Sequence, residues 1–198
     1  MSFKEPTNTS QTEIEIKKSR FISYAKKVIS RSEATSYISE LREQYPDARH
    51  VCWGYVIGNP KNSTNSGCND DGEPSGTAGK PILAQINYSN IGNVVVVVVR
   101  YFGGIRLGAG GLVRAYRASA KEALFNLSTQ ERIPKEEFIL HFPFSKENAV
   151  RRAISELNGE LLSSSYGPEV EFRVSIPSTQ TKELELITGN MNAKLVNP

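Results

Sequence analysis

Two glycine-rich turns carry residue types suited to holding an anion. The second turn, 103–111, follows six consecutive valines and precedes an apolar-periodic stretch, which predicts a strand, a turn and a helix in that order. Such a turn brings unpaired backbone N–H groups and the positive end of a helix together. Basic side chains beside the two turns would neutralise a phosphate. The predicted anion- or nucleic-acid-binding residues are Lys80, Arg100, Gly103, Gly104, Arg106, Gly108, Gly110, Gly111, Arg114 and Arg117.

Neither turn matches a familiar nucleotide motif. In the first turn, a P-loop would need glycine where Pro74 stands and serine or threonine where Pro81 stands. In the second, the dinucleotide fingerprint counted from Gly108 and Gly110 would place its third glycine at Val113. A single glycine is more simply explained by a positive φ or by close packing. Two such turns with basic residues beside them favour binding.

An acidic cluster in the first turn allows a second interpretation. Asp70, Asp71 and Glu73, with His50 upstream, could ligate Mg²⁺ or act as acid–base groups of a metal-assisted, peptidase-like hydrolase. Capping of turns and ion pairs with nearby arginines are favoured over metal binding. His50 and Cys52 could form a nucleophile pair, but neighbours on one face of a strand seldom have the required geometry. A binding role is therefore favoured over catalysis, and the sequence predicts no cofactor and leaves any metal undetermined.

The composition is that of an ordinary globular protein. The 198 residues are 38% hydrophobic and 23% charged, enough for one large domain or two small ones. Two cysteines are too few for a disulfide framework, and no apolar run has the length of a membrane span, so we expect a cytoplasmic protein without membrane association. Residues 1–134 carry 17 basic and 12 acidic residues, whereas 135–198 carry 7 and 9. Phosphate or nucleic acid would therefore suit the first segment.

The elements that position the turns are organised around the valine run. Six β-branched residues cannot alternate in and out of a core, so 94–99 is predicted to be a central strand buried on both faces. Residues 1–11 are expected to fray and 58–75 to form a long polar loop. Further strands are predicted over 12–16, 19–29 and 50–57, and helices over 32–44, from about 77 or 81, and over 109–127.

The helix predicted over 109–127 has two distinct faces. At 100° per residue, one arc is apolar and is expected to pack on the core. Another arc, on which three basic residues cluster, is expected to be cationic. The apolar arc comprises Leu112, Tyr116, Ala120, Ala123 and Leu127, and the cationic one Arg114, Arg117 and Lys121.

A second domain is predicted after a linker at 128–134. Its pattern is strand, helix, two strands, helix and strand, which is the βαββαβ order of ferredoxin-like domains. The elements are expected at 137–142, 146–157, 160–166, 170–176, 179–188 and 193–196. The predicted domains are therefore 1–131 and 135–198.

Two long motifs are specific enough to indicate a family. Residues 70–83 read DDGEPSGTAGKPIL and residues 100–116 read RYFGGIRLGAGGLVRAY. In this order, on either side of a valine-rich strand, they resemble the YigZ/IMPACT family, as do 19–22 and His50 with Cys52. The resemblance covers about 12–128, and the tail resembles the second domain of the bacterial members.

This resemblance implies an α+β protein. It implies an N-terminal domain similar to the second domain of ribosomal protein S5 and a tail similar to a C-terminal domain of elongation factor G. It also implies a nucleic-acid-binding or translation-associated role, with RNA or the ribosome as partner. Eukaryotic relatives compete for the activator of the amino-acid-starvation kinase, so a regulatory protein partner is an alternative. Some members are labelled proline dipeptidases, which corresponds to the hydrolase alternative. The oligomeric state is undetermined.

Overall fold

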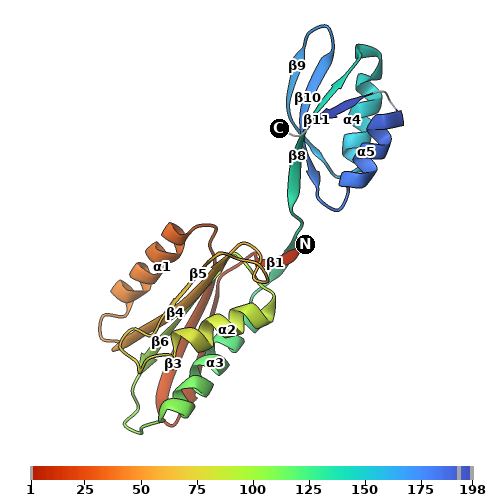
Figure 1. Cartoon of the computed structure of the whole chain (residues 1–198). Helices are drawn as coiled ribbons and strands as arrows, with labels where there is room; N and C mark the ends of the chain where they lie inside the picture. Colours follow the sequence, from red (N-terminus) through yellow and green to blue (C-terminus); the bar gives the residue numbers. More distant parts are fainter. Residues whose placement is uncertain (1, 191–192, 197–198) are drawn as a thin grey trace. The chain divides into compact units, whose positions relative to one another are not determined.

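The chain forms two compact units (Figure 1). The computed structural model describes residues 2–190 and 193–196. One unit spans Ser2–Arg132 and the other begins at Ile133. None of the helices in these ranges combines the length and the apolarity that crossing a bilayer would require.

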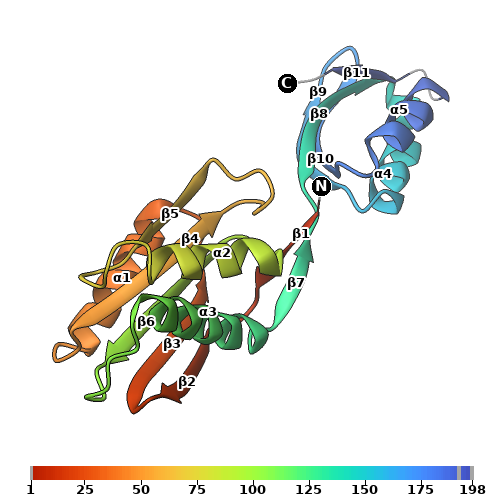
Figure 2. The ribbon, with the colours of Figure 1, turned by 60° about the horizontal axis from the view of Figure 1, so that its bottom comes forward.

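The first unit is built on a five-stranded sheet with the order β2-β3-β6-β4-β5. All neighbouring strands are antiparallel. Helix α1 covers one face of this sheet, and α2 and α3 cover the other (Figures 1 and 2). The strands are β2 (Ser10–Ile16), β3 (Ser19–Lys27), β4 (His50–Ile57), β5 (Asn65–Asn69) and β6 (Val94–Tyr101). The helices are α1 (Arg31–Gln44), α2 (Gly79–Ser89) and α3 (Ala109–Phe125).

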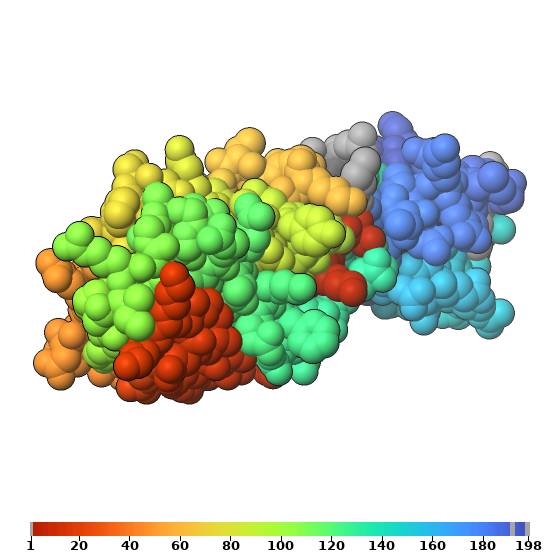
Figure 3. All heavy atoms as spheres, turned by 90° about the horizontal axis from the view of Figure 1, so that it is seen from below, coloured from red at the N-terminus to blue at the C-terminus, as the bar shows by residue number. Residues whose placement is uncertain are grey.

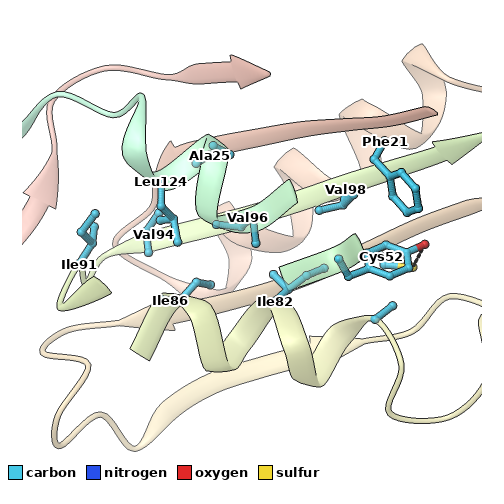
Figure 4. Packing of buried hydrophobic residues seen from close by; sticks show 14 of the residues in the cluster. Phe21, Ala25, Cys52, Ile82, Ile86, Ile91, Val94, Val96, Val98 and Leu124 are labelled. Atoms are coloured by element: carbon cyan, nitrogen blue, oxygen red, sulfur yellow. Dashed lines mark hydrogen bonds between the residues drawn. The ribbon is translucent and has the colours of Figure 1, made fainter. Parts of the chain in front are cut away.

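Strand β6 is the central element, and the prediction that both its faces are buried is confirmed. All six valines, Val94–Val99, have no exposed surface. Val94, Val96 and Val98 face Ile82 and Ile86 of α2 (Figure 4), whereas the alternate valines pack in the cluster beneath α1. An antiparallel sheet usually leaves one face wet, and the helices on both sides explain why this strand can be entirely apolar.

Helix α3 has the two faces predicted for it. The apolar arc of Leu112, Tyr116, Ala120 and Ala123 is buried, and so is Leu127, which lies two residues beyond the end of the helix because α3 ends at Phe125 and not at the predicted 127. The basic side chains of the other arc, Arg114, Arg117 and Lys121, are exposed.

Three segments predicted to be irregular contain strands. Strand β1 (Phe3–Pro6) lies in the stretch expected to fray, of which residue 1 is outside the described part. It pairs with β7 (Thr129–Arg132), which occupies the predicted linker. Strand β5 lies within the predicted loop 58–75 and pairs with β4.

Helix α1 is capped by Ser30, whose side chain accepts a hydrogen bond from the Glu33 amide.

The second unit has the predicted βαββαβ order. Its antiparallel strands are arranged β11-β8-β10-β9, and α4 and α5 complete the core around residues such as Phe142 and Phe172. This is the ferredoxin-like arrangement. The elements are β8 (Lys135–Phe142), the 3₁₀ turn η1 (Phe144–Lys146), α4 (Glu147–Glu156), β9 (Glu160–Tyr166), β10 (Val170–Pro177), α5 (Thr181–Asn190) and β11 (Lys194–Val196).

Candidate nucleic-acid interface

The turn before α3 leaves the N-terminus of that helix open. Gly104 and Gly108 have φ values of 83° and 71°, which favour glycine, and nothing lies within 4 Å of the place where either would carry a Cβ. No side chain caps the helix at Gly108. Arg106 is exposed between the two glycines, and Gly110 is exposed in the first turn of α3. Unpaired N–H groups and a guanidinium are therefore available together to an anion.

Two glycines of this turn serve packing. A Cβ on Gly103 would overlap the backbone of Lys18 in the turn between β2 and β3. The Gly103 amide also donates a hydrogen bond to the Ser19 hydroxyl at 3.2 Å. At Gly111, a Cβ would come within 2.9 Å of the Leu107 Cβ. These glycines hold the turn in place, and their prediction as ligand-facing residues receives no support from this packing.

The close contact at Gly103 adds two lysines to the neighbourhood of the turn. Lys17 and Lys18 form the tight connection between β2 and β3, with φ values of 49° and 64°. Both side chains are exposed. Neither lysine is among the predicted binding residues, although two consecutive lysines between predicted strands indicate a cationic hairpin tip.

A cationic groove runs between α2 and α3. The two helices adjoin on the face shown in Figure 3. The groove has a volume of about 620 Å³. Within residues 2–190 and 193–196, no ion pair involves any of the basic side chains of this region that are exposed, namely Lys80, Arg106, Arg114, Arg117 and Lys121. The lining residues are Ala84, Gln85, Tyr88, Arg114, Arg117, Ala118 and Lys121.

The sequence around this groove is depleted in acidic residues. Between Gly79 and Ser128 the chain has five exposed basic residues and one acidic residue, Glu122. An excess of unpaired cations on one helical layer attracts polyanions over a distance comparable to the Debye length.

Arg100 does not belong to this cationic surface, so its prediction as a phosphate ligand is wrong. Its Nη1 donates to Glu73 Oε1 at 2.6 Å, and the two side chains are only 8% and 3% exposed. The guanidinium also lies 5.5 Å from the centre of the Phe21 ring. The carboxylate of Glu73 neutralises the buried guanidinium. Without that partner the buried charge would be far more costly.

The N-terminus of α2 is already occupied by a carboxylate from the chain itself. Asp70 accepts hydrogen bonds of 2.7–2.9 Å from the amides of Gly76, Ala78 and Gly79. Burial alone would raise the pKa of Asp70, but these hydrogen bonds and Lys80 outweigh burial and lower it. The first glycine-rich turn is thus capped by Asp70. Lys80, the one binding residue predicted in this turn, is exposed.

The other members of the acidic cluster are also engaged in protein contacts. Asp71 pairs with Arg42 at 2.6 Å and accepts the Val51 amide at 2.7 Å. Glu73 accepts the hydroxyl of Tyr116 at 2.8 Å in addition to Arg100. In the part of the chain that the structure describes, no group of three or more His, Cys, Asp or Glu is placed to hold a metal ion. The loop-capping interpretation of this cluster matches these contacts.

His50 and Cys52 fasten the acidic loop to β4. His50 Nδ1 donates to the backbone carbonyl of Asp71 at 2.8 Å, and the Cys52 thiol donates to that of Asp70 at 2.9 Å. Burial raises the pKa of Cys52 well above its ordinary value. A protonated, buried thiol is a poor nucleophile, so these contacts favour a structural role for the pair.

Comparisons with known proteins agree on one family. The Impact N-terminal domain matches residues 17–124. The chain is 41% identical over 169 residues to the IMPACT family member YigZ of Escherichia coli K12, with 85% of this chain and 83% of that protein covered. It is 38% identical over 185 residues to the IMPACT family member YvyE of Bacillus subtilis 168, with 92% and 83% covered.

A solved structure extends the similarity to both units. A crystal structure described as that of a hypothetical protein is 35% identical, with a TM-score of 0.72. The match covers 100% of this chain and 97% of the solved one.

Proposed function

The chain belongs to the IMPACT family, and from that premise we propose that it binds RNA, free or in the ribosome, through the turn before α3 and the cationic side of that helix. The observation that carries the proposal is the set of exposed basic residues without an ion-pair partner in the described ranges, next to a helix N-terminus that no side chain caps. Backbone N–H groups and guanidinium groups at such a site contact phosphates irrespective of base sequence.

We propose a cellular role for this RNA binding as well. The resemblance to the family implies a task connected with translation, and a ribosomal partner would place the chain in the cytoplasm. The similarity of the two units to domains of ribosomal protein S5 and elongation factor G stays a prediction. A regulatory protein with an acidic surface would use the same cations, and binding that survives nuclease treatment would favour it.

The test is a fluorescence-anisotropy titration of labelled single- and double-stranded RNA at two salt concentrations. We expect affinity to fall steeply with salt, because each neutralised phosphate contributes a slope of about −0.7 to −0.9 in log K against log salt. Replacing two cations in Arg106→Ala/Arg114→Ala should make that slope shallower by about 1.5.

The control is Arg31→Ala, which removes an exposed cation on the opposite helical layer. It should leave both the affinity and the slope unchanged. Binding that does not depend on salt, or that Arg31→Ala weakens as much as the double variant does, would contradict the proposal.

A further inference from the structure

Two large aromatic side chains are exposed beside the cationic groove. Tyr88 of α2 is 87% exposed and Phe125 of α3 is 82% exposed. In the described part of the chain, neither ring pairs with another aromatic ring. A single exposed aromatic needs no explanation, but two that line one groove indicate a place where flat apolar groups bind.

The two rings share one continuous surface. A second groove of about 420 Å³ adjoins the first, because both are lined by Gln85, Tyr88 and Lys121. It continues past Phe125 to Lys4 of β1. We call the two grooves together the α2–α3 surface. Part of its lining is small, since Ala84 and Ala118 leave room between the basic and aromatic side chains.

The cations of this surface are not explained by helix stability. Arg114 and Arg117 are three residues apart on α3, and Arg117 and Lys121 are four apart, so like charges are neighbours along one side of the helix. Like-charged pairs at these spacings destabilise an isolated helix. A polyanion lying along the row would relieve this repulsion.

A groove on the opposite layer, along α1, has a different lining. It is lined by serines and a threonine together with one basic residue, Arg31, and two acidic residues, Glu40 and Glu43. Its lining contains no aromatic residue. A further groove on the α1 side does combine Lys26 and Lys27 with Tyr37. There, however, Tyr37 is buried and Lys26 already lies over its ring, whereas the aromatic rings of the α2–α3 surface are exposed.

We propose that the α2–α3 surface binds single-stranded nucleic acid, with bases stacked on Tyr88 and Phe125 and the backbone held by Arg117 and Lys121. Single strands offer unstacked base faces to aromatic side chains, whereas a duplex keeps its bases stacked inside. The Gln85 amide lines both grooves and can hydrogen-bond a base edge. This inference rests on the proposed function and adds the single-stranded form of the ligand.

The experiment compares labelled oligouridylate, oligothymidylate and duplex RNA of about 10 nucleotides, within the ~4–16 that single-strand binders cover. Anisotropy titrations use the full chain as wild type, Tyr88→Ala/Phe125→Ala, Tyr88→Phe and Arg106→Ala/Arg114→Ala. Phe144→Ala, an exposed aromatic of the second unit, is the control. Because Tyr88 and Phe125 are so exposed, their loss should not affect folding, which circular dichroism checks.

We expect Tyr88→Ala/Phe125→Ala to bind oligouridylate at least about 5-fold more weakly, because the loss of one stacked base corresponds to about 5- to 150-fold. Its duplex affinity and salt dependence should stay as in the wild type. Tyr88→Phe, which keeps the ring, and Phe144→Ala should both bind like the wild type. If the wild type binds oligothymidylate more weakly than oligouridylate, the ligand is single-stranded RNA. If it binds the two equally, the ligand is a single strand of either RNA or DNA. Both outcomes support the inference.

Three outcomes would overturn the inference, and they separate it from the proposed function. If the double aromatic variant binds single strands as tightly as the wild type, stacking is excluded while a loss in the arginine variant still supports phosphate binding. If the wild type binds duplex RNA more tightly than single strands, stacking is likewise excluded, and phosphate binding is still supported by a loss in the arginine variant. If the wild type binds no nucleic acid but binds a labelled polyglutamate peptide in a Tyr88-dependent manner, both proposals fail and the surface binds protein.

Discussion

At the residue scale, the charge of Arg100 holds the loop that carries Glu73 against the sheet. Its guanidinium contacts Glu73 and the Ser19 hydroxyl, and Tyr116 of α3 donates to the same carboxylate. Strand β6, the acidic loop, β3 and α3 are thereby tied together at one end of the sheet. Removing one partner would leave a buried charge unpaired, which costs several kcal/mol in comparable sites.

Glu5 is a second buried carboxylate, and its titration gives a testable pH dependence. Burial alone would raise its pKa, but hydrogen bonds from Lys27, Asn93, Gln130 and Arg132 outweigh burial and lower the pKa from 4.5 to about 2. A lowered folded-state pKa means that the contribution to stability is present above pH 4.5 and is lost as the pH falls towards 2. The shift corresponds to on the order of 3 kcal/mol. We expect Glu5→Gln to be less stable than the wild type by about that amount near pH 7, and the difference to shrink near pH 3, by urea unfolding.

The matched control is Glu13→Gln, which removes a carboxylate from the exposed pair with Arg20. Exposed ion pairs contribute less than about 1 kcal/mol, so this variant should change stability little at either pH. A gap between wild type and Glu5→Gln that is the same near pH 7 and near pH 3 would contradict the argument.

At the element scale, periodicity was a good guide to the helices and a poor one to the short strands. The 3.6-residue pattern of α3 predicts both its buried and its cationic face. Strands β1 and β7 have four residues each, and their pairing joins Phe3 to Arg132, so no local pattern marks them. Strand β5 has the sequence NSGCN, which has low β-propensity, and its pairing with β4 determines its conformation.

Replacing two glycines of the segment 103–111 by alanine should change the stability of the fold in opposite directions. A side chain at Gly103 meets the backbone of Lys18, which cannot move away easily. Gly103→Ala should therefore destabilise the first unit by about 1–3 kcal/mol. At Gly110 the nearest atom is Arg114 Nη1 at 3.6 Å, an ordinary contact inside a helix. Gly110→Ala should be neutral or stabilise by up to about 1 kcal/mol. Thermal denaturation measures both.

Equal melting temperatures for Gly103→Ala and the wild type would show that the turn is not held by this contact.

Gly103 and Gly110 also indicate why the sequence could not assign the site residues fully. Both glycines occur in one motif, and only the position of the β2–β3 turn distinguishes a packing glycine from an open one.

At the scale of the whole molecule, each unit has a hydrophobic core of its own. The first unit has one cluster on each face of its sheet, and the second has a separate cluster around Phe142 and Phe172. The ferredoxin-like order could be predicted from the succession of strands and helices of ordinary length after residue 135, whereas the α+β class was implied by the resemblance to the family. The burial of Arg100 could not, because its partner Glu73 belongs to a loop 27 residues away.

Separate cores predict separate unfolding transitions. Phe172 is fully buried and its ring centre lies 4.9 Å from that of Phe142, so Phe172→Ala should destabilise the second unit by about 3–5 kcal/mol. Differential scanning calorimetry should show that transition shifted downwards and the other unchanged. Ile82→Ala, in the first unit, should shift the other transition instead. A single transition that both variants shift would mean that the two units unfold together.

The valine strand also has a consequence for the chain during synthesis. Six uncharged β-branched residues in a row have the composition of an aggregation-prone segment. Strands β3 and β4 precede β6 in the chain and can pair with it as it emerges, but α3, which covers one of its faces, is made later. Helix α2, which is made before β6, covers part of that face, and the rest of the apolar face stays open until the ribosome has added α3. Arg100, at the end of the run, then acts as a gatekeeper charge against other chains until Glu73 neutralises it in the finished fold.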